Sequence, residues 1–179
     1  MKLCIVTTPI RPKPTIYPPF GSMAIIQSLR KIGEEVSFFH IDYFRYSHVE
    51  VVEYFKNNQF DMVGISAVVS TAYGYTKYLT EIIKDIKKET VIFLGGGLAA
   101  SAEILHRKAN VDFCVQGDGE IISQNLVKAL RENKTSDSDL EKIKGISYLD
   151  SNDRFKFTGY DHALPASMIE RPDYGILEE

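Results

Sequence analysis

Short, continuous apolar runs alternate along the chain with stretches in which apolar residues recur every three or four positions. The continuous runs are rich in β-branched residues and lie at 3–7, 35–41, 61–69, 90–95 and 111–116. Continuous hydrophobicity over such lengths is typical of strands that are covered on both faces, as in parallel sheets. The pattern therefore predicts a set of buried, parallel strands.

The segments between these runs have the spacing of amphipathic helices. They lie at 19–32, 48–57, 71–88, 100–108 and 119–132. Gly33 follows the first of them, where a glycine that ends a helix is expected. This alternation predicts an α/β fold with right-handed crossovers and a doubly wound parallel sheet. We expect a Rossmann-like, flavodoxin-like sheet of five strands in the order 2-1-3-4-5.

The pattern changes after the last predicted helix. Residues 133–142 are polar and are predicted to form a loop or linker. The segments 145–150 and 154–159 flank a turn-forming Ser-Asn-Asp sequence and predict a C-terminal β-hairpin. The last twenty residues show little periodicity and read as a connector or as a tail that packs on the domain. We therefore divide the chain into a binding domain at 1–132 and an appendage at 133–179.

Composition narrows the class of protein. The 179 residues suit one domain of ordinary size, and a net charge of −3 argues against a strongly electropositive nucleic-acid binder. Cys4 and Cys114 lie in separate apolar runs, so they form no CxxC zinc site, disulfide scaffold or three-cysteine iron–sulfur loop. No segment approaches the ~20 apolar residues that span a bilayer. We expect a cytoplasmic protein with two buried strand cysteines and no membrane partner.

Ligands of open α/β sheets bind beyond the carboxyl ends of the strands. The loop after the first strand holds prolines at positions 9, 12, 14, 18 and 19 and then Gly21. It lacks GxGxxG, GxxxxGK[ST] and the Ser/Thr/Gly-rich phosphate loop of flavodoxins, so NAD, P-loop and FMN sites are disfavoured. The loop is either a stiff wall beside a ligand or a rigid connector.

The third strand ends in hydroxyl-bearing residues. Ser66 interrupts an apolar run, and Ser70 and Thr71 precede the next helix. Ser66 is a candidate ligand contact. Ser70 and Thr71 are candidates as well, with the alternative that one of them is the N-cap of that helix.

Gly95, Gly96 and Gly97 follow the fourth strand. One glycine is explained by a turn, but three are entropically costly unless the backbone needs positive φ or close approach. The triplet indicates a large ligand pressed against the main chain.

Two glycines and two acids follow the fifth strand. Gly117, Gly119 and Glu120 are candidate ligand contacts, with the alternative that the acids stabilise a helix N-terminus. The four histidines form no metal-binding spacing, and we expect His40 to be a partly exposed polar residue at a strand end. No Ser-His-Asp set or acid pair is visible, so we assign no catalytic and no metal-binding residue.

Taken in order, these segments resemble the N-terminal cobalamin-binding domain of B12-dependent radical SAM enzymes. The resembling segments are 18–36, 60–71, 91–105, 111–120, 145–150 and 164–177. That family has PPxG in its first loop, GIS at the end of its third strand, GG after its fourth and a GEGE-like turn after its fifth. The corresponding sequences here are PPFG, GIS, GGG and GDGE.

The resemblance implies roles for the residues near the corrin ring. Pro18, Pro19 and Gly21 would shape the loop beside it, and Ser66 would meet the nucleotide tail of cobalamin. The DxHxxG signature of the methionine synthase type is absent from the first loop. The lower histidine ligand of cobalt is therefore not expected there.

The resemblance also implies roles for the glycine-rich turns. Gly95 and Gly96 would let the dimethylbenzimidazole tail pass, and Gly117, Gly119 and Glu120 would line the far side of the cleft.

The chain departs from the family at three positions. Val69 stands where a threonine is common, so Ser70 or Thr71 would have to substitute for it. Leu98 stands in place of part of a common Pro-His pair, and Asp118 replaces a glutamate in the GEGE-like turn.

The resemblance implies that this chain binds and orients cobalamin and is not catalytic alone. S-adenosylmethionine and a 4Fe-4S cluster would belong to a radical SAM barrel in a missing C-terminal domain or in a separate chain. We expect the chain to end near the start of that barrel, whose methyltransferase-like or related radical chemistry the cobalamin would serve. The alternatives are a degenerate domain that acts as a scaffold or interaction module, and a flavodoxin-like or receiver module. A receiver needs an acid pair after the first strand and an aspartate after the third, and neither is present.

Overall fold

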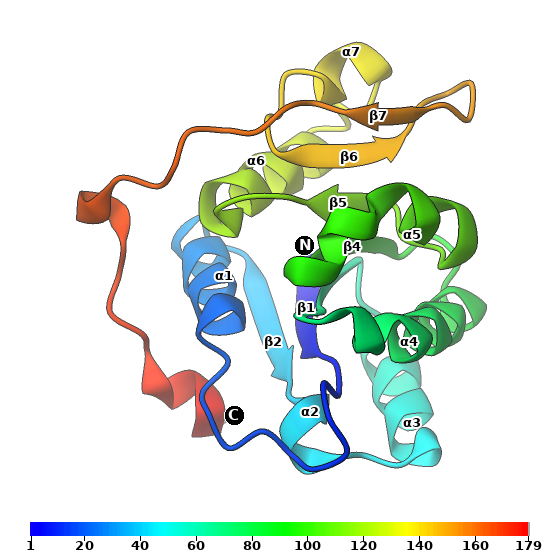
Figure 1. Cartoon of the computed structure of the whole chain (residues 1–179), viewed down its shortest axis with the longest axis vertical. Helices are drawn as coiled ribbons and strands as arrows, with labels where there is room; N and C mark the ends of the chain where they lie inside the picture. The colour runs from blue at the N-terminus through cyan, green and yellow to red at the C-terminus, as the bar shows by residue number, and fades with distance from the viewer. Residues whose placement is uncertain (179) are drawn as a thin grey trace.

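The computed structural model describes residues 1–178 and has one mixed sheet in the strand order β2-β1-β3-β4-β5-β6-β7 (Figure 1). Strands β1 to β5 are parallel, and β6 and β7 are antiparallel to their neighbours. The strands are β1 (Lys2–Thr7), β2 (Glu35–Phe39), β3 (Met62–Ser66), β4 (Val91–Gly95), β5 (Phe113–Val115), β6 (Ile146–Leu149) and β7 (Phe155–Phe157). The predicted α/β class and the order 2-1-3-4-5 are confirmed.

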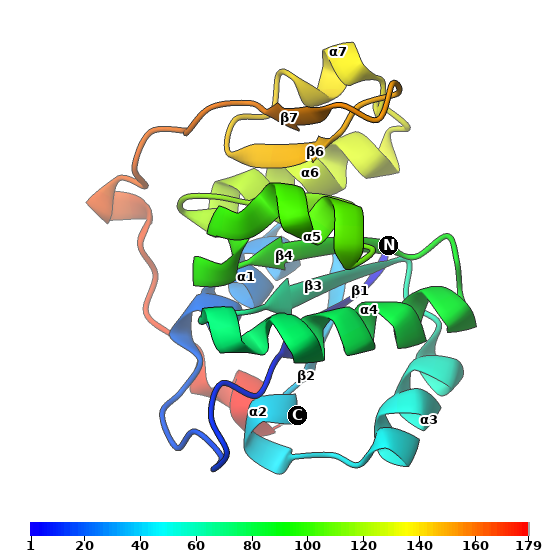
Figure 2. The ribbon, with the colours of Figure 1, turned by 45° about the vertical axis from the view of Figure 1, so that its right-hand side comes forward.

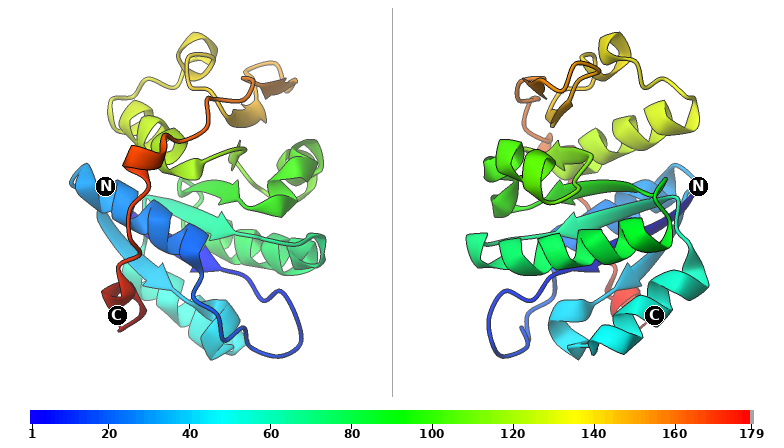
Figure 3. Two further views of the ribbon diagram at one scale, coloured as in Figure 1. Left: turned by 60° about the vertical axis from the view of Figure 1, so that its left-hand side comes forward. Right: turned by 90° about the vertical axis from the view of Figure 1, so that its right-hand side faces the viewer.

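Helices cover both faces of the parallel strands, as Figure 2 and Figure 3 show. The α-helices are α1 (Phe20–Lys31), α2 (Ile41–Phe44), α3 (His48–Asn58), α4 (Tyr73–Ile86), α5 (Ala102–Lys108), α6 (Gly119–Arg131) and α7 (Asp137–Leu140). The 3-10 helices are η1 (Ser70–Ala72), η2 (Gly97–Ser101), η3 (Ala166–Met168) and η4 (Tyr174–Glu178). The five predicted helices are all present. The strand predicted at 61–69 is shorter than expected, since β3 ends at Ser66 and residues 67–69 are loop.

Two apolar cores lie on the two faces of the sheet. In β1, Leu3 and Ile5 belong to the core beneath α1 and α6, while Cys4 and Val6 belong to the core beneath α3, α4 and α5. All four are almost fully buried. Side chains of a strand alternate between its faces, so burial on both faces explains why the run is apolar without interruption.

The C-terminal hairpin forms as predicted, and its first strand continues the sheet. Cys114 and Val115 of β5 pair with Ser147 and Ile146 of β6. The polar stretch before it is not all loop. Helix α7 forms there because Ser136 accepts a hydrogen bond from the amide of Asp139 as its N-cap.

The final segment packs along α1. The Gln27 side chain donates to the carbonyl of Arg171 at 3.0 Å and accepts from the amide of Asp173 at 3.0 Å. Ile176 is buried in the core beneath α1 and α6. The interpretation as a packed tail is confirmed, and Figure 3 shows this segment crossing α1.

No helix within residues 1–178 combines the length and apolar character that a bilayer crossing requires.

A buried histidine joins α5 to β6. His106 Nδ1 donates to the carbonyl of Val111 at 2.8 Å, and its Nε2 lies 3.1 Å from the hydroxyl of Ser147. A carbonyl can only accept, so Nδ1 carries the proton and the neutral ring accepts from Ser147. Burial lowers the pKa of His106.

The free energy of unfolding should therefore fall as the pH is lowered through the range below about 6.5. In that range the unfolded chain binds a proton at His106 that the folded chain excludes. His40, whose pKa is also lowered by burial, acts in the same direction. Urea unfolding at several pH values should show a shallower acid dependence for His106→Gln. The exposed His162→Gln is the matched control, and equal slopes for both variants would contradict the assignment.

Candidate functional site

A cavity of about 550 Å³ opens at the carboxyl ends of the parallel strands, between them and the first turns of α1 and α6. Its wall includes Thr7, Ser66 and Gly95, which are paired across β1, β3 and β4. The cavity borders the pairing of β1 with β3, where the strand order reverses. Cofactor sites of open α/β sheets lie at that point, and the volume is typical of small-molecule sites.

The cavity brings together most of the residues that the sequence singles out. Those that line it are Pro18, Pro19, Gly21, Ser66, Gly95, Gly96, Gly117, Gly119 and Glu120. Ser70, Thr71 and Gly97 lie outside its lining.

Ser70 and Thr71 do not have the alternative role of helix caps. They form the 3-10 turn η1, and the N-cap of α4 is Ala72, which makes no side-chain hydrogen bond. The capping interpretation is therefore wrong. Val68 lines the cavity from this loop instead.

The glycine triplet has two different physical causes. A Cβ on Gly96 would lie 2.6 Å from the carbonyl oxygen of Ala67, and one on Gly97 would lie 2.5 Å from that of Val68. Gly96 also has φ +91°. A Cβ on Gly95 would meet nothing within 4 Å. The chain's own backbone thus requires Gly96 and Gly97, so the whole triplet does not need a ligand to explain it, and only Gly95 has no cause in the packing of the described residues.

The floor of the cavity is apolar and was missed by the sequence analysis. Gly64 lies in the middle of β3, where an added Cβ would lie 2.4 Å from Phe93 Cζ and 2.6 Å from Ile5 Cδ1. Val115 continues this floor on β5. A glycine inside a strand of β-branched residues was the available signal, because it marks a close approach.

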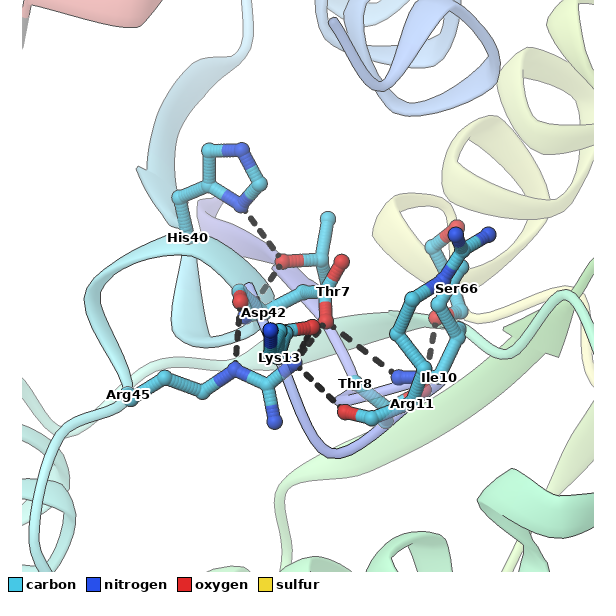
Figure 4. Close-up of polar contacts among 9 residues, drawn as sticks. All are labelled: Thr7, Thr8, Ile10, Arg11, Lys13, His40, Asp42, Arg45 and Ser66. Atoms are coloured by element: carbon cyan, nitrogen blue, oxygen red, sulfur yellow. Dashed lines mark hydrogen bonds and ion pairs between the residues drawn. The ribbon is translucent and has the colours of Figure 1, made fainter. Parts of the chain in front are cut away.

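Arg45 holds the proline-rich loop against α2 (Figure 4). Its guanidinium donates to the carbonyls of Arg11 and Lys13, both at 2.7 Å, and forms a 3.0 Å ion pair with Asp42. Asp42 is buried and accepts from the amide of Ile10 at 3.2 Å. No sequence motif predicted this network, because it joins the loop after β1 to residues of α2 and of the segment that follows it.

A second set of polar contacts lies beside it, also drawn in Figure 4. The Thr7 hydroxyl lies 2.8 Å from His40 Nδ1 and accepts from the amide of Asp42 at 3.2 Å. Thr8 donates to the carbonyl of Ser66 at 3.1 Å. His40 lines the cavity, and burial lowers its pKa, so the ring is neutral near pH 7. His40 is partly exposed and lies directly after β2, as expected, and it also borders the cavity.

Three hydroxyls in the cavity wall lack hydrogen-bond partners. Ser22 on α1, Ser123 on α6 and Thr15 in the proline-rich loop have buried oxygens that contact no donor or acceptor among the described residues. Leaving a buried hydroxyl unpaired costs about 1–3 kcal/mol.

The charges at the cavity are acidic. Within residues 1–178, no Lys or Arg lines it, whereas Asp42, Asp118 and Glu120 do. Asp118 accepts from the amide of Leu164 at 2.6 Å and does not cap α6. Helix α1 also lacks a side-chain cap. In α1, the amide of Phe20 donates to the carbonyl of Pro18 at 2.9 Å and that of Met23 to the carbonyl of Pro19 at 3.0 Å, so neither amide is available to a ligand.

The part of the chain that the structure describes contains no group of three His, Cys, Asp or Glu side chains that could hold a metal ion. Cys4 and Cys114 are buried free thiols, as expected, and burial raises the pKa of each to about 12. Neither thiol is reactive at neutral pH.

Because Gly96 is required by the backbone and Gly95 is not, two matched alanine substitutions should differ in their effect on the free energy of unfolding. Gly96→Ala should lower the free energy of unfolding by at least about 1–3 kcal/mol, because of positive φ and the clash with Ala67. Gly95→Ala should change it by less than about 0.5 kcal/mol, because its Cβ enters open space. Denaturant titration of both variants measures the difference, and equal losses would refute the distinction.

Replacing Arg45 by methionine should free the proline-rich loop. We expect a loss of about 1.5–3 kcal/mol, since charge-assisted hydrogen bonds disappear. Hydrogen exchange at the Ile10 amide should accelerate. Lys77→Met, which removes an exposed cation from α4, should leave that exchange rate unchanged. Unchanged exchange in Arg45→Met would show that the loop is held by other contacts.

The fold is similar to several solved structures. The cobalamin-dependent S-adenosylmethionine radical enzyme OxsB with aqua-cobalamin bound gives a TM-score of 0.72 at 17% identity, over 90% of this chain and 22% of that one. TsrM from Kitasatospora setae, a radical S-adenosylmethionine methyltransferase, gives 0.68 at 20% identity, over 96% and 31%. A cobalamin-binding protein from Desulfitobacterium hafniense gives 0.55 at 18% identity, over 69% and 57%.

Two curated relatives share sequence similarity with the chain. Both are anaerobic magnesium-protoporphyrin IX monomethyl ester cyclases. The Cereibacter sphaeroides protein is 25% identical over 73% of this chain and 21% of its own length. The Synechocystis protein is 26% identical over 87% and 30%. The chain thus spans less than a third of either relative.

The match to a protein family covers most of the binding domain. Residues 11–127 match the B12 binding domain family, from the proline-rich loop to the middle of α6. This range contains nearly all the loops that line the cavity. The chain therefore belongs to the B12 binding domain family.

Proposed function

We propose that this chain binds cobalamin in the cavity at the carboxyl edge of its sheet. The observation that carries the proposal is the cavity of about 550 Å³ at the point where the strand order reverses, in a member of the B12 binding domain family. Open α/β sheets bind their cofactors at that point.

The charge of the site favours cobalamin over nucleotides that carry several phosphates. A dinucleotide or FMN would bring two or more negative charges to a wall that, within residues 1–178, has acids and no Lys or Arg. Cobalamin carries neutral amides and a single phosphodiester. The N-terminus of α6, which has no side-chain cap, suits one such group.

Separate parts of the wall would hold separate parts of the cofactor. Pro18, Pro19 and Gly21 would shape the loop beside the corrin, and Arg45 holds the earlier part of the same loop through the carbonyls of Arg11 and Lys13. Ser66 would contact the nucleotide tail. This assignment makes the rigidity of the proline-rich loop part of binding, since a preformed wall loses less entropy when the ligand enters.

The glycine-rich turns would leave room for the nucleotide tail of cobalamin. Gly95 and Gly96 border it on one side, with Gly117, Gly119 and Glu120 on the other. Ser70, Thr71 and Gly97 have no contact role in this proposal, because they lie outside the cavity. When bound, cobalamin supplies a cobalt centre that can carry a methyl group or assist radical chemistry. The residues of this chain bind and orient it, and none is proposed to be catalytic.

We further propose that the domain serves a radical SAM enzyme. The support is the likeness to OxsB and TsrM, which are named as radical S-adenosylmethionine proteins. In that arrangement S-adenosylmethionine and a 4Fe-4S cluster are held by a separate barrel, in the same or another chain. The substrate is set by that barrel.

The alternative of a degenerate domain that acts as a scaffold is not favoured by the structure. It rests on Val69 and Leu98, where the chain departs from the family pattern. Neither residue lines the cavity. Leu98 is buried in the core beneath α4 and α5, so its side chain serves packing. These two departures leave the wall of the cavity intact.

Hydroxocobalamin at micromolar concentration should bind the purified chain with a shift of its visible spectrum. Gly95→Leu should weaken binding at least about tenfold, because a leucine side chain would occupy space that the ligand needs. Gly74→Leu is the matched control, since Gly74 also faces open space but lies on α4 away from the cavity. Folded parent protein that takes up no cobalamin would refute the proposed function.

A further inference from the structure

A second cavity, of about 500 Å³, lies at the edge of the sheet that β2 forms. Residues of β2, α2, α3 and η4 line it, and Figure 1 shows η4 close to β2 and α2. Ile176 holds η4 in place, because its side chain is buried in the core beneath α1 and α6. Of the residues that line this edge cavity, only His40 also lines the first one. The edge cavity is therefore a separate space, and its volume is typical of small-molecule sites.

Aromatic side chains form much of the wall of the edge cavity. They are Phe38, Phe39, Phe44, Tyr46 and Tyr54. The ring of Phe39 stacks on those of Tyr46 and Tyr54, with centroids 4.7 Å and 3.8 Å apart. Phe44 stacks on Tyr46 at 5.5 Å and is itself 56% exposed. Stacking thus fixes the positions of these rings and leaves aromatic surface open at Phe44.

The charges around these rings are all negative. Glu50 and Glu53 lie one turn apart on α3, and Glu178 comes from η4. Within residues 1–178, no Lys or Arg lines the edge cavity, and neither Glu53 nor Glu178 forms an ion pair. Burial lowers the pKa of His40, so its ring adds no positive charge near pH 7. The negative charge of the wall is therefore not compensated by the protein.

Aromatic surface beside uncompensated carboxylates favours a cationic ligand. The face of an aromatic ring carries partial negative charge and attracts a cation, the more so when the cation leaves water. The carboxylates add to this attraction, whereas an anion would be repelled by them. The wall therefore selects ligands by the sign of their charge.

The arrangement of the acids narrows the kind of cation. The part of the chain that the structure describes has no group of three His, Cys, Asp or Glu side chains that could hold a metal ion. A primary ammonium brings three N–H donors that each need an acceptor, and Glu50 Oε2 already accepts from the amide and the hydroxyl of Ser47, both at 2.7 Å. A quaternary ammonium has no donors to satisfy, and its methyl groups pack on aromatic rings. The edge cavity suits such a cation best.

We propose that the cavity between β2, α3 and η4 binds a small organic cation with a quaternary ammonium group. In this arrangement Phe44 and Tyr46 contact the methyl groups, and Glu53 and Glu178 supply the opposite charge. Leu177 of η4 contributes apolar wall on the other side. The proposal does not depend on the binding of cobalamin, because the two cavities are separate.

The test compares three ligands by ligand-detected NMR titration of the full chain. They are choline, 3,3-dimethylbutan-1-ol, in which a carbon atom replaces the charged nitrogen, and ethanolamine, which has a primary ammonium on the same short chain. We expect choline to bind about tenfold more tightly than 3,3-dimethylbutan-1-ol, because the two have the same shape and only choline is charged. Ethanolamine should also bind more weakly than choline.

Two variants assign the preference to the rings and the acids. Phe44→Leu removes an exposed ring but keeps an apolar side chain, and Glu53→Gln removes a charge but keeps the shape of the side chain. Each should weaken choline binding at least about threefold and change the binding of 3,3-dimethylbutan-1-ol less than about twofold.

Two matched controls remove the same groups elsewhere on the surface. Phe157→Leu changes a partly exposed ring on β7, and Glu81→Gln changes an exposed acid on α4. Neither residue lines the edge cavity, so both controls should leave all three affinities unchanged. Thermal unfolding of each variant checks that it is folded.

The possible outcomes are distinct. Equal affinities for choline and 3,3-dimethylbutan-1-ol, or an equal loss of both in Phe44→Leu and Glu53→Gln, would overturn the proposal by showing an apolar groove that does not recognise charge. Ethanolamine binding as tightly as choline would overturn the selection of a quaternary ammonium. A folded chain that shows no choline binding up to about 10 mM would overturn the site itself. Since cobalamin is absent from these titrations, their result and that of the cobalamin titration are independent.

Discussion

The common register of the parallel strands is the constraint on which the rest of the structure depends. Thr7, Ser66 and Gly95 pair in one row across β1, β3 and β4. Because these strands end at the same level, the loops that follow them meet at one edge. Crossovers that wind to opposite faces from the β1–β3 pair leave a crevice at that edge. The cavity is a consequence of this topology before any ligand is considered.

One side of the cavity wall is a loop held by hydrogen bonds, and the other side is built from small residues. The proline-rich loop is held by Arg45 and the buried Asp42, so its shape is set by hydrogen bonds to backbone carbonyls. On the opposite side, Gly96 fits against the carbonyl of Ala67 and leaves Gly95 next to open space. Rigidity lowers the entropy lost on binding, and small residues preserve volume. Both features suit the large ligand that we propose for this site.

The buried polar groups differ in what they contribute to the stability of the fold. Buried thiols, His106 and Ser147 have partners or apolar surroundings that keep them inert and support the fold. Ser22 and Ser123 are unpaired in the same structure. An unpaired buried hydroxyl lowers the free energy of unfolding, so these two hydroxyls weaken the fold, whereas His106 and Ser147 support it.

The sequence by itself determined the α/β class and the edge of the sheet where the candidate site lies, because continuous apolar runs and glycine-rich strand ends are local signals. The expected strand order rested on analogy with other doubly wound sheets, and the tertiary structure fixed it. The sequence could not separate Gly95 from Gly96 and Gly97, or exclude Ser70 and Thr71, because those differences depend on contacts with another loop. Only the tertiary structure decided that Arg45 holds the proline-rich loop and that α1 and α6 pack together beside the cavity. Those pairings join residues far apart in the chain, and their distances are set by packing of α1 and α6 on the sheet, which no local pattern encodes.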